Sequence, residues 1–367
     1  MAKKKVLHVV GDSKFGGGSV VIAQLVIDQS SSGFDVSVLT TDSEFSAYLA
    51  AHAIKVVNLD CIWRSYNLFS DMYGILKLAR YLRANPFDVV HTHTTKAGFV
   101  GRVAAWMANI KYIVHTVHGF PFSEVSSKVK VAVFSTLEAF LYKISTKVVF
   151  VSHYHLAWAV KLGIVDTDYS GAVAIRNGVK RVFATLPAER ESSLARIVFI
   201  GRIVKEKGVF DLLAAYRILH ENYPDLKVVF IGDGPDLTEL KSLVTADDAI
   251  EFTGFVTDVT SLVSPYDIFA LPSYREGLSI SAIEAQSMGL ASVLSDVGGN
   301  VEVASNGNAA LIFRTGDSTD LAANLSTLLG DAILRTNLGA AALNHFEQNF
   351  TDQRMLQEYK DLYGQFS

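Results

Sequence analysis

Two glutamates eight residues apart, Glu276 and Glu284, carry the clearest chemical signal in this sequence of 367 residues. They surround Gly277, Leu278 and Ser279, which follow a predicted strand and open a predicted helix. Backbone N–H groups at a helix start, together with the helix dipole, favour an anion such as a diphosphate. An ionised carboxylate accepts hydrogen bonds from two neighbouring hydroxyls. The segment therefore predicts a diphosphate site in which one glutamate holds a sugar diol and the other a ribose.

Two cations stand at a second predicted strand-to-helix turn. Arg202 and Lys207 follow the apolar run 196–200, and Gly201 lets the chain turn sharply between them and the strand. A guanidinium offers a planar fork of donors and an ammonium is a mobile point charge, so the pair predicts a diphosphate clamp that needs no metal ion. Taken alone, basic loop residues are better explained as solvated surface positions, and two glutamates eight residues apart are weak evidence of a site.

The first half of the chain supplies a glycine-rich segment, Gly16–Gly18, between a predicted strand and a helix beginning near Ser19. Three glycines permit positive φ angles and a close approach of the backbone to a ligand. The spacing is not the G-x-G-x-x-G pattern of dinucleotide sites, which disfavours a nicotinamide dehydrogenase. The segment by itself is also compatible with a flexible turn.

Four histidines lie at or near the ends of two predicted strands: His91, His93, His115 and His118. His91 and His93 are two residues apart, so their side chains point the same way on a strand. No carboxylate accompanies them in a familiar ligand pattern. We therefore expect helix capping or the lining of a polar cleft ahead of metal binding, and we expect no metal at all in the site.

The order of the predicted elements places these residues on one architecture. Short apolar runs alternate with amphipathic stretches, which specifies parallel sheets wrapped by helices. The runs cover residues 6–10, 36–40, 56–59, 89–92, 112–116 and 147–151, then 196–200, 227–231, 250–252, 268–271, 291–295 and 310–313. The stretch 177–193 has the composition of a linker. We expect an N-terminal domain (1–180), a C-terminal domain (194–350) and a final helical segment (351–367) that could pack back on the first domain.

Doubly wound sheets bind ligands beyond the carboxyl ends of their strands. The predicted fold class is therefore α/β, with two Rossmann-like domains whose sites face a shared cleft. Half of the residues are hydrophobic and 19% are charged, enough for two buried cores. The net charge of −4 and the absence of a basic face exclude a nucleic-acid partner. One cysteine, Cys61, excludes an intrachain disulfide. Without a signal peptide or a membrane-spanning run, the sequence predicts a cytoplasmic protein.

With these residues in place, the sequence resembles the family-4 retaining glycosyltransferases, which have the GT-B fold. The resemblance rests on Glu276 and Glu284 within the segment 272–284, preceded by Gly201-Arg202 and Lys207-Gly208. The segments 231–235, 254–256 and 296–300 are also similar at matching places. It covers essentially the whole chain. The segment Met288–Ala291 departs from it, because many relatives carry a structural proline there.

The resemblance implies a role for each matching residue. Arg202 and Lys207 would grip the donor diphosphate, Glu276 the transferred sugar and Glu284 the ribose. His118 would contact a sugar hydroxyl and orient the anomeric centre without acting as a nucleophile. The catalytic set would thus be His118, Arg202, Lys207 and Glu276. The donor-binding set would be Gly17, Gly18, Gly232, Asp233, Phe255, Val256, Gly277, Leu278, Ser279 and Glu284.

The implied reaction moves a hexose from a nucleotide sugar to an acceptor hydroxyl with retention. A UDP-sugar, glucose or N-acetylglucosamine, is favoured over a GDP-sugar. The segments 93–98 and 118–120 look like bacterial family members that build surface polysaccharides on lipid-linked acceptors. Lysines at 128, 130 and 143 beside apolar residues, with the mixed segment 61–66, would form an acceptor mouth or a peripheral membrane face, or else pack on their own domain. A sugar-nucleotide 2-epimerase and a non-catalytic nucleotide-sugar sensor are the alternatives.

Overall fold

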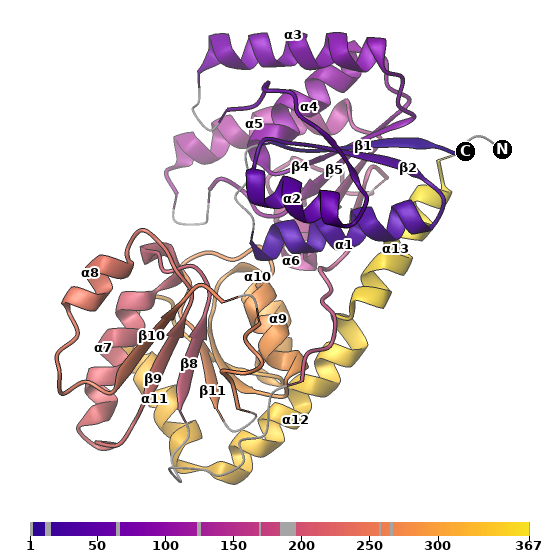
Figure 1. Cartoon of the computed structure of the whole chain (residues 1–367). Coiled ribbons are helices and arrows are strands. Elements are labelled where there is room, and N and C mark those ends of the chain that lie inside the picture. Colours follow the sequence, from indigo (N-terminus) through magenta and orange to yellow (C-terminus); the bar gives the residue numbers. More distant parts are fainter. Residues whose placement is uncertain are drawn as a thin grey trace. The chain divides into compact units, whose positions relative to one another are not determined.

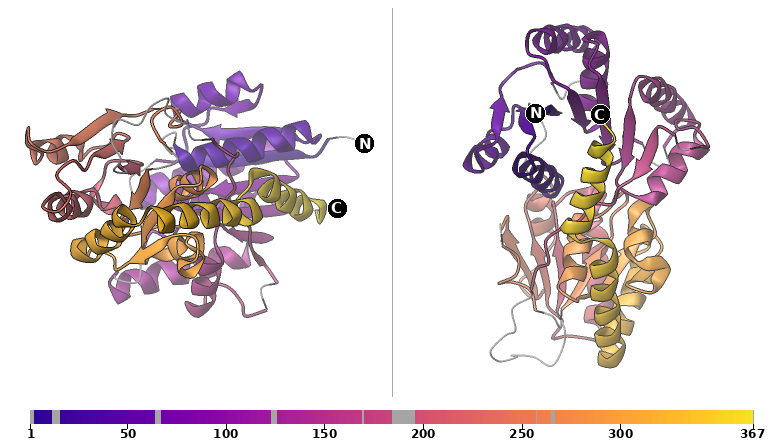
Figure 2. Two further views of the ribbon diagram at one scale, coloured as in Figure 1. Left: turned by 90° about the horizontal axis from the view of Figure 1, so that it is seen from below. Right: turned by 90° about the vertical axis from the view of Figure 1, so that its right-hand side faces the viewer.

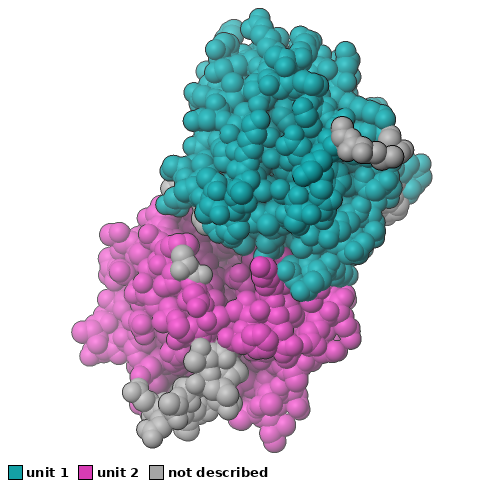
Figure 3. Space-filling view, turned by 45° about the vertical axis from the view of Figure 1, so that its right-hand side comes forward, with its two compact units in different colours: residues 1–177, 352–367 teal, residues 178–351 magenta. Residues whose placement is uncertain are grey.

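The computed structural model describes residues 3–11, 16–63, 67–122, 126–168, 170–183, 196–256, 258–264 and 267–366. They divide into two compact units, which Figure 3 shows in different colours. Unit 1 consists of Met1–Asn177 together with Asp352–Ser367, and unit 2 consists of Gly178–Thr351. Each unit contains one parallel sheet with its own helices (Figure 1).

Unit 1 is built on a seven-stranded sheet in the order β3-β2-β1-β4-β5-β6-β7. Its strands are β1 (Lys5–Gly11), β2 (Asp35–Thr40), β3 (Lys55–Val57), β4 (Val89–His93), β5 (Tyr112–Val117), β6 (Lys147–Phe150) and β7 (Ala172–Ala174). Its helices are α1 (Gly17–Ser31), α2 (Ser43–Ala51), α3 (Leu68–Ala84), α4 (Thr95–Met107), α5 (Lys128–Lys143), α6 (His153–Lys161) and α13 (Asp352–Gly364). All strand pairs are parallel, as the alternation of strands and helices predicts.

Unit 2 has a six-stranded sheet in the order β10-β9-β8-β11-β12-β13. Its strands are β8 (Ile197–Ile200), β9 (Val228–Ile231), β10 (Ile250–Gly254), β11 (Ile268–Leu271), β12 (Ala291–Ser295) and β13 (Leu311–Phe313). Its helices are α7 (Val209–His220), α8 (Leu237–Ser242), α9 (Ile280–Ser287), α10 (Gly298–Val303), α11 (Ser318–Gly330) and α12 (Ala332–Asn349), with short 3-10 turns η1 (Lys205–Lys207) and η2 (Ser305–Gly307).

The two sheets share one strand order, in which the direction of winding reverses between the first and fourth strands. The reversal lies between β1 and β4 in unit 1, and between β8 and β11 in unit 2. Because the loops after these two strands leave on opposite faces of a sheet, a crevice opens at their carboxyl ends, and ligands of doubly wound folds bind there. The fold thus singles out the turns after β8 and β11, and the ends of β1 and β4.

Both faces of the first sheet are covered by apolar cores, so its strands are buried from both sides. Leu7 and Val9 belong to a core shared with α3 and α4, whereas Val10 belongs to a core shared with α1 and α2. Successive side chains of a strand point to opposite faces. His8, between Leu7 and Val9, therefore lies on the α1 side, where it is fully buried.

Helix α13 completes unit 1 from the far end of the sequence. Its buried residues Met355, Tyr359, Leu362 and Tyr363 form one stripe at helical spacing, and the helix packs against α1. The two ends of the chain lie near each other (Figures 1 and 2), and Lys4 Nζ donates a hydrogen bond to the Phe366 carbonyl. None of the helices in the described ranges is long and apolar enough to cross a bilayer.

Most predicted strands differ from the observed ones by one or two residues at an end. The clearest differences are two. Strand β7 has no counterpart among the predicted runs, because its three residues, Ala172–Ala174, are too few to give a periodic pattern. Helix α1 begins at Gly17 instead of near Ser19, so two of the three glycines belong to its first turn.

Candidate active site

In unit 2, Lys207 and Glu276 meet directly although 69 residues separate them in the chain. Lys207 ends the 3-10 turn after β8, and Glu276 lies in the turn after β11, which is the neighbouring strand. Lys207 Nζ donates to Glu276 Oε1 at 2.5 Å, and Ser273 Oγ donates to the same oxygen at 2.7 Å. The carboxylate is buried and the ammonium is partly exposed. The switch point of unit 2 therefore holds a half-buried ion pair of two predicted site residues.

Free hydrogen-bonding groups surround this ion pair. Within the described ranges, Glu276 Oε2 makes no hydrogen bond, and the backbone N–H groups of Gly277 and Leu278 have no protein acceptor. Helix α9 begins at Ile280, and Ser279 caps it by accepting a hydrogen bond from the Ala282 N–H. The N–H groups of Gly277 and Leu278 thus precede the helix. Together with Glu276 Oε2, they offer two donors and one acceptor to a ligand.

Two glycines permit the close packing of the turns around the ion pair. Gly208 has φ +68° and lies against the Pro272 carbonyl, which a Cβ would approach to 1.9 Å. Gly232 has φ +142° and lies equally close to the carbonyl of Gly201. A side chain at either position would combine an unfavourable backbone conformation with a clash against main chain. Glycine is therefore required where the turn after β8 meets its neighbours.

The remaining donor-binding candidates of unit 2 line the same edge of the sheet. Gly232 donates its N–H to the Gly254 carbonyl at 2.9 Å, which joins the turn after β9 to the residue before Phe255. The Asp233 carbonyl accepts from the Ile203 N–H at 2.9 Å, next to Arg202. The side chains of Arg202, Asp233 and Phe255 are exposed, and Val256 is partly buried. In the described part of the chain, Arg202 forms no ion pair.

Glu284 lies in the second turn of α9, partly buried, and its carboxylate has no hydrogen-bond or ion-pair partner in the described ranges. Burial raises its pKa from 4.5 to about 7, because the charged form loses hydration without gaining a counter-charge. A solvated helix residue would not show this shift. Within the described residues no hydrogen bond joins Glu284 to Glu276, as expected of two ionised carboxylates, which are both acceptors. An isolated carboxylate of this kind is typical of a ligand site.

The glycine segment of unit 1 does not use the positive φ angles that its glycines permit. Gly16 is extended, with φ 176°, and caps α1, while Gly17 and Gly18 are helical. Gly16 has no side chain with which to cap the helix. Among the described residues, a Cβ at Gly16 or Gly18 would meet no atom within 4 Å, so there is open space beside both glycines. Residues 12–15, which precede them, lie outside the described residues.

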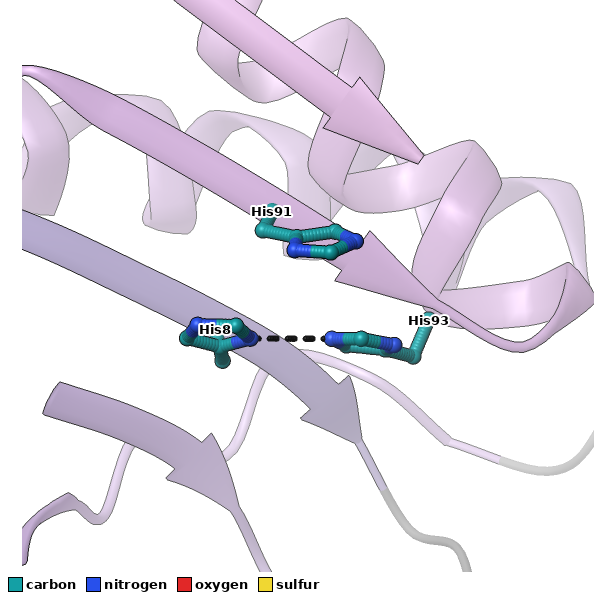
Figure 4. Close-up of side chains that lie close together, drawn as sticks. All are labelled: His8, His91 and His93. Atoms are coloured by element: carbon teal, nitrogen blue, oxygen red, sulfur yellow. Dashed lines mark hydrogen bonds between the residues drawn. The ribbon is translucent and has the colours of Figure 1, made fainter. Parts of the chain in front are cut away.

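His118 stands directly after β5 as the outer member of a buried set of histidines. Its Nε2 lies 3.2 Å from His93 Nδ1, His93 Nε2 lies 3.0 Å from His8 Nδ1, and His8 Nε2 lies 2.8 Å from Gln29 Oε1 (Figure 4 shows the His8–His93 contact). His118 is partly exposed, while His8 and His93 are buried. We call Gln29, His8, His93 and His118 the histidine chain.

His91 adjoins the histidine chain through ring stacking and forms a separate branch. Its ring lies 4.3 Å from that of His93, centroid to centroid, and Figure 4 shows both rings at the end of β4. His91 Nδ1 lies 2.8 Å from the Tyr363 hydroxyl, and His91 Nε2 lies 2.8 Å from Thr116 Oγ1. The expectation that His91 and His93 cap a helix or line a cleft is wrong, because both are buried in this network.

Burial keeps these imidazoles uncharged. The pKa values of His8 and His118 are lowered from 6.5 to about 4, and those of His91 and His93 fall well below 6.5, chiefly through loss of hydration. Nitrogens of His8, His91 and His93 lie within 4.8 Å of one another, a spacing that could hold a metal ion. However, both ring nitrogens of each already have a hydrogen-bond partner. The arrangement is that of a hydrogen-bond network.

Three of these residues carry little signal in the sequence. Ser273, which fixes Glu276, is a serine in a turn segment whose chemical signal comes from its glutamate and glycine. His8 lies in a run that otherwise reads as a buried strand, and a polar residue there was the available signal. Gln29 lies on α1 with no local feature to mark it. His115, by contrast, is occupied structurally, since its Nδ1 lies 2.9 Å from Thr92 Oγ1.

Two family models together span most of the chain. Residues 15–181 match the model described as Glycosyltransferase Family 4, and residues 188–345 match the model described as Glycosyl transferases group 1. The first match contains strands β2 to β7 of unit 1, and the second contains Arg202, Lys207, Glu276 and Glu284.

Curated relatives match over nearly their full length. The chain is 26% identical over 348 residues to the UDP-Gal:alpha-D-GlcNAc-diphosphoundecaprenol alpha-1,3-galactosyltransferase of Escherichia coli, covering 90% of this chain and 89% of that protein. It is 26% identical over 342 residues to the N,N'-diacetylbacillosaminyl-diphospho-undecaprenol alpha-1,3-N-acetylgalactosaminyltransferase of Campylobacter jejuni, covering 89% and 90%.

Solved structures agree in fold. A glycosyltransferase from Rickettsia africae superposes with a TM-score of 0.82 at 20% identity, over 100% of this chain and 99% of that one. Anabaena Alr3699/HepE in complex with UDP and glucose also gives 0.82, at 19% identity, over 98% and 99%. The predicted architecture of two Rossmann-like domains is confirmed. The chain belongs to the family-4 glycosyltransferases and has the GT-B fold.

Proposed function

We propose that this glycosyltransferase moves a hexose from a UDP-sugar to a hydroxyl of a lipid-linked saccharide, with retention at the anomeric carbon. The observation that carries the proposal is the contact between Lys207 and Glu276 beside the free N–H groups of Gly277 and Leu278. A cation and two amides suit a diphosphate, and a carboxylate with one free oxygen suits the hydroxyls of the attached sugar.

Each proposed role follows from the chemistry of the side chain. Arg202 is exposed and without an ion pair in the described ranges, so it is available to grip the diphosphate together with Lys207. Glu276 Oε2 accepts from hydroxyls of the transferred sugar, and Glu284 accepts from the ribose. Phe255 is exposed after β10 and stacks on the base in this proposal, with Val256, Gly232 and Asp233 beside it. His118 orients the sugar through a hydroxyl.

The reaction needs no dedicated base. The bond from the anomeric carbon to the diphosphate oxygen breaks while a bond to the acceptor oxygen forms on the same face. The acceptor proton passes to the departing diphosphate oxygen. Arg202, Lys207 and the N–H groups of Gly277 and Leu278 stabilise the charge that develops on that oxygen, which is commonly the largest contribution to such catalysis. We propose that the two cations make a divalent metal ion unnecessary.

The names of similar proteins guide the choice of donor and acceptor. The relative from Escherichia coli is named as transferring galactose from UDP-galactose to GlcNAc-diphosphoundecaprenol, and the structure of Anabaena Alr3699/HepE contains UDP and glucose. A capsular polysaccharide glycosyltransferase of Staphylococcus aureus is 23% identical over the whole chain. We favour UDP-glucose or UDP-N-acetylglucosamine here, in bacterial polysaccharide synthesis, with galactosyl donors and GDP-mannose as the competing candidates.

An exposed apolar surface of unit 1 suits an acceptor held in a membrane. Helices α3 and α5 both pack on α4 (Figure 1), and on their outer sides Phe69 is 87% exposed and Val129 is 74% exposed. Lys128 and Lys130 lie beside Val129 and are also exposed. Apolar residues flanked by lysines bind anionic lipid surfaces. We propose peripheral contact at the inner face of the cell membrane. Of the segment 61–66, Cys61 is buried and 64–66 lie outside the described residues.

A donor panel tests the reaction. The purified full-length chain is incubated with UDP-glucose, UDP-N-acetylglucosamine, UDP-galactose, UDP-N-acetylgalactosamine or GDP-mannose, together with undecaprenyl-diphosphate-linked saccharides, with and without EDTA. We expect an α-linked product from a UDP-sugar, formed equally well in EDTA. An isomerised nucleotide sugar without a glycosidic product would identify an epimerase. Tight binding of UDP-sugars without turnover on any acceptor would identify a sensor.

Vesicle flotation tests the membrane surface. Leu68→Ser combined with Phe69→Ser should reduce binding to vesicles containing anionic lipid, because the two side chains are 73% and 87% exposed in water. The control is Ile333→Ser in unit 2, where the side chain is 76% exposed on α12, a helix that contains no lysine. Equal binding by all three proteins would remove this surface from the proposal.

A further inference from the structure

We propose that Gln29, His8 and His93 act as positioning residues that hold His118 in its neutral Nε2–H tautomer, with Nδ1 as a hydrogen-bond acceptor for a sugar hydroxyl. The proposal rests on the function proposed above, because it assigns the acceptor atom to the histidine of that reaction. It adds three residues that make no contact with substrate.

Burial keeps the imidazoles of His8, His93 and His118 neutral, because the charged form of each would lose its hydration. A neutral imidazole donates through one ring nitrogen and accepts through the other, whereas a protonated one donates through both. His8 and His93 are fully buried, and no carboxylate contacts either ring in the described ranges. A ring of the histidine chain that donates through one nitrogen must therefore accept through the other. One fixed end decides the tautomers of all three histidines.

Gln29 supplies the fixed end. Its Oε1 lies 2.8 Å from His8 Nε2, and an amide oxygen only accepts. The nitrogen end of the same amide, Nε2, is buried and makes no hydrogen bond in the described part of the chain.

The direction then follows link by link. His8 donates from Nε2 to Gln29, so its Nδ1 accepts from His93 Nε2 at 3.0 Å. His93 Nδ1 accepts in turn from His118 Nε2 at 3.2 Å. The remaining nitrogen of His118, Nδ1, is therefore an acceptor, and it has no partner in the described part of the protein. His118 is the one partly exposed member of the chain, so its free acceptor is the end that a ligand can reach.

The buried polar groups of the histidine chain serve to fix one tautomer of His118. A lone histidine at the end of β5 would exchange between two tautomers, and only one of them accepts a hydroxyl proton at Nδ1. Gln29, His8 and His93, from α1, β1 and β4, remove that choice before substrate arrives. Preorganised hydrogen bonding of this kind is how enzymes orient a reacting group without a cost at the moment of reaction.

Imidazole nitrogen spectra of the 15N-histidine-labelled full chain test the tautomers directly. We expect His8, His93 and His118 to be neutral at pH 7.5, each with the proton on Nε2. A proton on His118 Nδ1, a charged ring, or a stoichiometric metal ion bound by His8, His91 and His93 would overturn the proposal. This measurement needs no activity, so it separates failure of the proposal from failure of the proposed transferase function.

Gln29→Met removes the fixed end while nearly keeping the side-chain length. We expect a mixed His118 tautomer and a fall of about tenfold in kcat, the value of one hydrogen bond, with the Kd for UDP unchanged because UDP lacks the sugar. The matched control is Thr116→Val, which cuts the His91 branch at the same depth and should leave both readouts unchanged. A mixed tautomer with unchanged kcat would refute the positioning role.

Discussion

The switch points of the two units of this glycosyltransferase differ in their electrostatics. In unit 2, Lys207 and Glu276 form an ion pair that is partly open to solvent, between turns packed through glycines. In unit 1, the equivalent place between β1 and β4 holds neutral histidines that are almost completely buried. A site for a diphosphate needs charge and access to water. A site that only orients a hydroxyl needs direction, which neutral hydrogen bonds supply at a lower cost of burial.

We expect the largest loss of activity when charge is removed from the ion pair in unit 2. Lys207→Ala and Glu276→Gln should each lower the transfer rate by about 100- to 1,000-fold, the range seen when one electrostatic donor of an active site is lost. The measurement is initial rate at saturating donor. The control is Lys205→Ala, two residues away, whose ammonium is 64% exposed and pairs with Glu239 at 3.1 Å. Full activity in both site variants would remove the reaction from this switch point.

In unit 1, acid is expected to reduce stability, because the buried histidines are held neutral. The pKa of His8 is lowered from 6.5 to about 4, so the unfolded chain binds a proton that the folded protein refuses over this interval. Above pH 6.5, His8 does not reduce the unfolding free energy. As the pH falls toward 4, the unfolding free energy decreases by at most about 3 kcal/mol because of this group. His8→Gln should reduce that loss, while His52→Gln, at an exposed position, should not.

Tryptophan fluorescence is a suitable measurement for the acid series. All three tryptophans of the chain, Trp63, Trp106 and Trp158, lie in unit 1, so their emission follows unfolding of that unit. Urea titrations at pH 7.5 and pH 5 give the difference for each variant. An identical pH dependence in wild type and His8→Gln would show that His8 is not held neutral by the fold.

Glycine packing distinguishes the two regions at a smaller scale. Gly208→Ala should cost about 1–3 kcal/mol more than Gly163→Ala, the usual range for overpacking. Both positions have nearly the same backbone conformation, φ +68° and +67°, but a Cβ at Gly208 would lie 1.9 Å from the Pro272 carbonyl and one at Gly163 would meet open space. Thermal unfolding followed by circular dichroism measures both. Equal losses would mean that the turn at Gly208 adjusts freely.

The smallest expected effect concerns Glu284. Burial raises its pKa to about 7, so the carboxylate is mostly neutral at pH 6 and mostly ionised at pH 8. If the ionised form accepts the ribose hydroxyls, the affinity for a UDP-sugar should rise over this interval by up to about tenfold. Glu284→Gln should abolish the pH dependence measured by calorimetry. A UDP-sugar is the right probe, since its diphosphate does not titrate near pH 7. An unchanged slope in the variant would exclude Glu284 as the titrating group.

The raised pKa of Glu284 also predicts how the stability of the protein depends on pH. The folded-state pKa of Glu284 lies above its ordinary value, so its contribution is fully present below pH 4.5 and is lost as the pH rises through 7. The ligand-free Glu284→Gln variant should therefore be more stable than wild type at pH 8 and similar at pH 4.5. Loss of stability at pH 8 would indicate a structural partner for Glu284.

The sequence by itself determined the class of fold and the candidate residues of unit 2. Glu276, Gly277 and Glu284 lie within nine consecutive positions, and Arg202 and Lys207 within six, so their relation is visible in the chain. The chemistry of these turn residues depends on the conformation and the free N–H groups of a single turn, so a short segment of sequence is enough to predict it. The alternation of apolar runs was likewise local, and it predicted both parallel sheets.

Only the tertiary structure decided the arrangement of unit 1. Gln29, His8, His93 and His118 come from four separate segments, and Tyr363 arrives on α13 from the other end of the chain. The register that sets His8 opposite His91 is fixed by strand pairing across 83 residues. Whether a buried histidine is neutral, and which nitrogen holds its proton, depends on partners that meet only after the sheet has formed. No local pattern in the sequence records that choice.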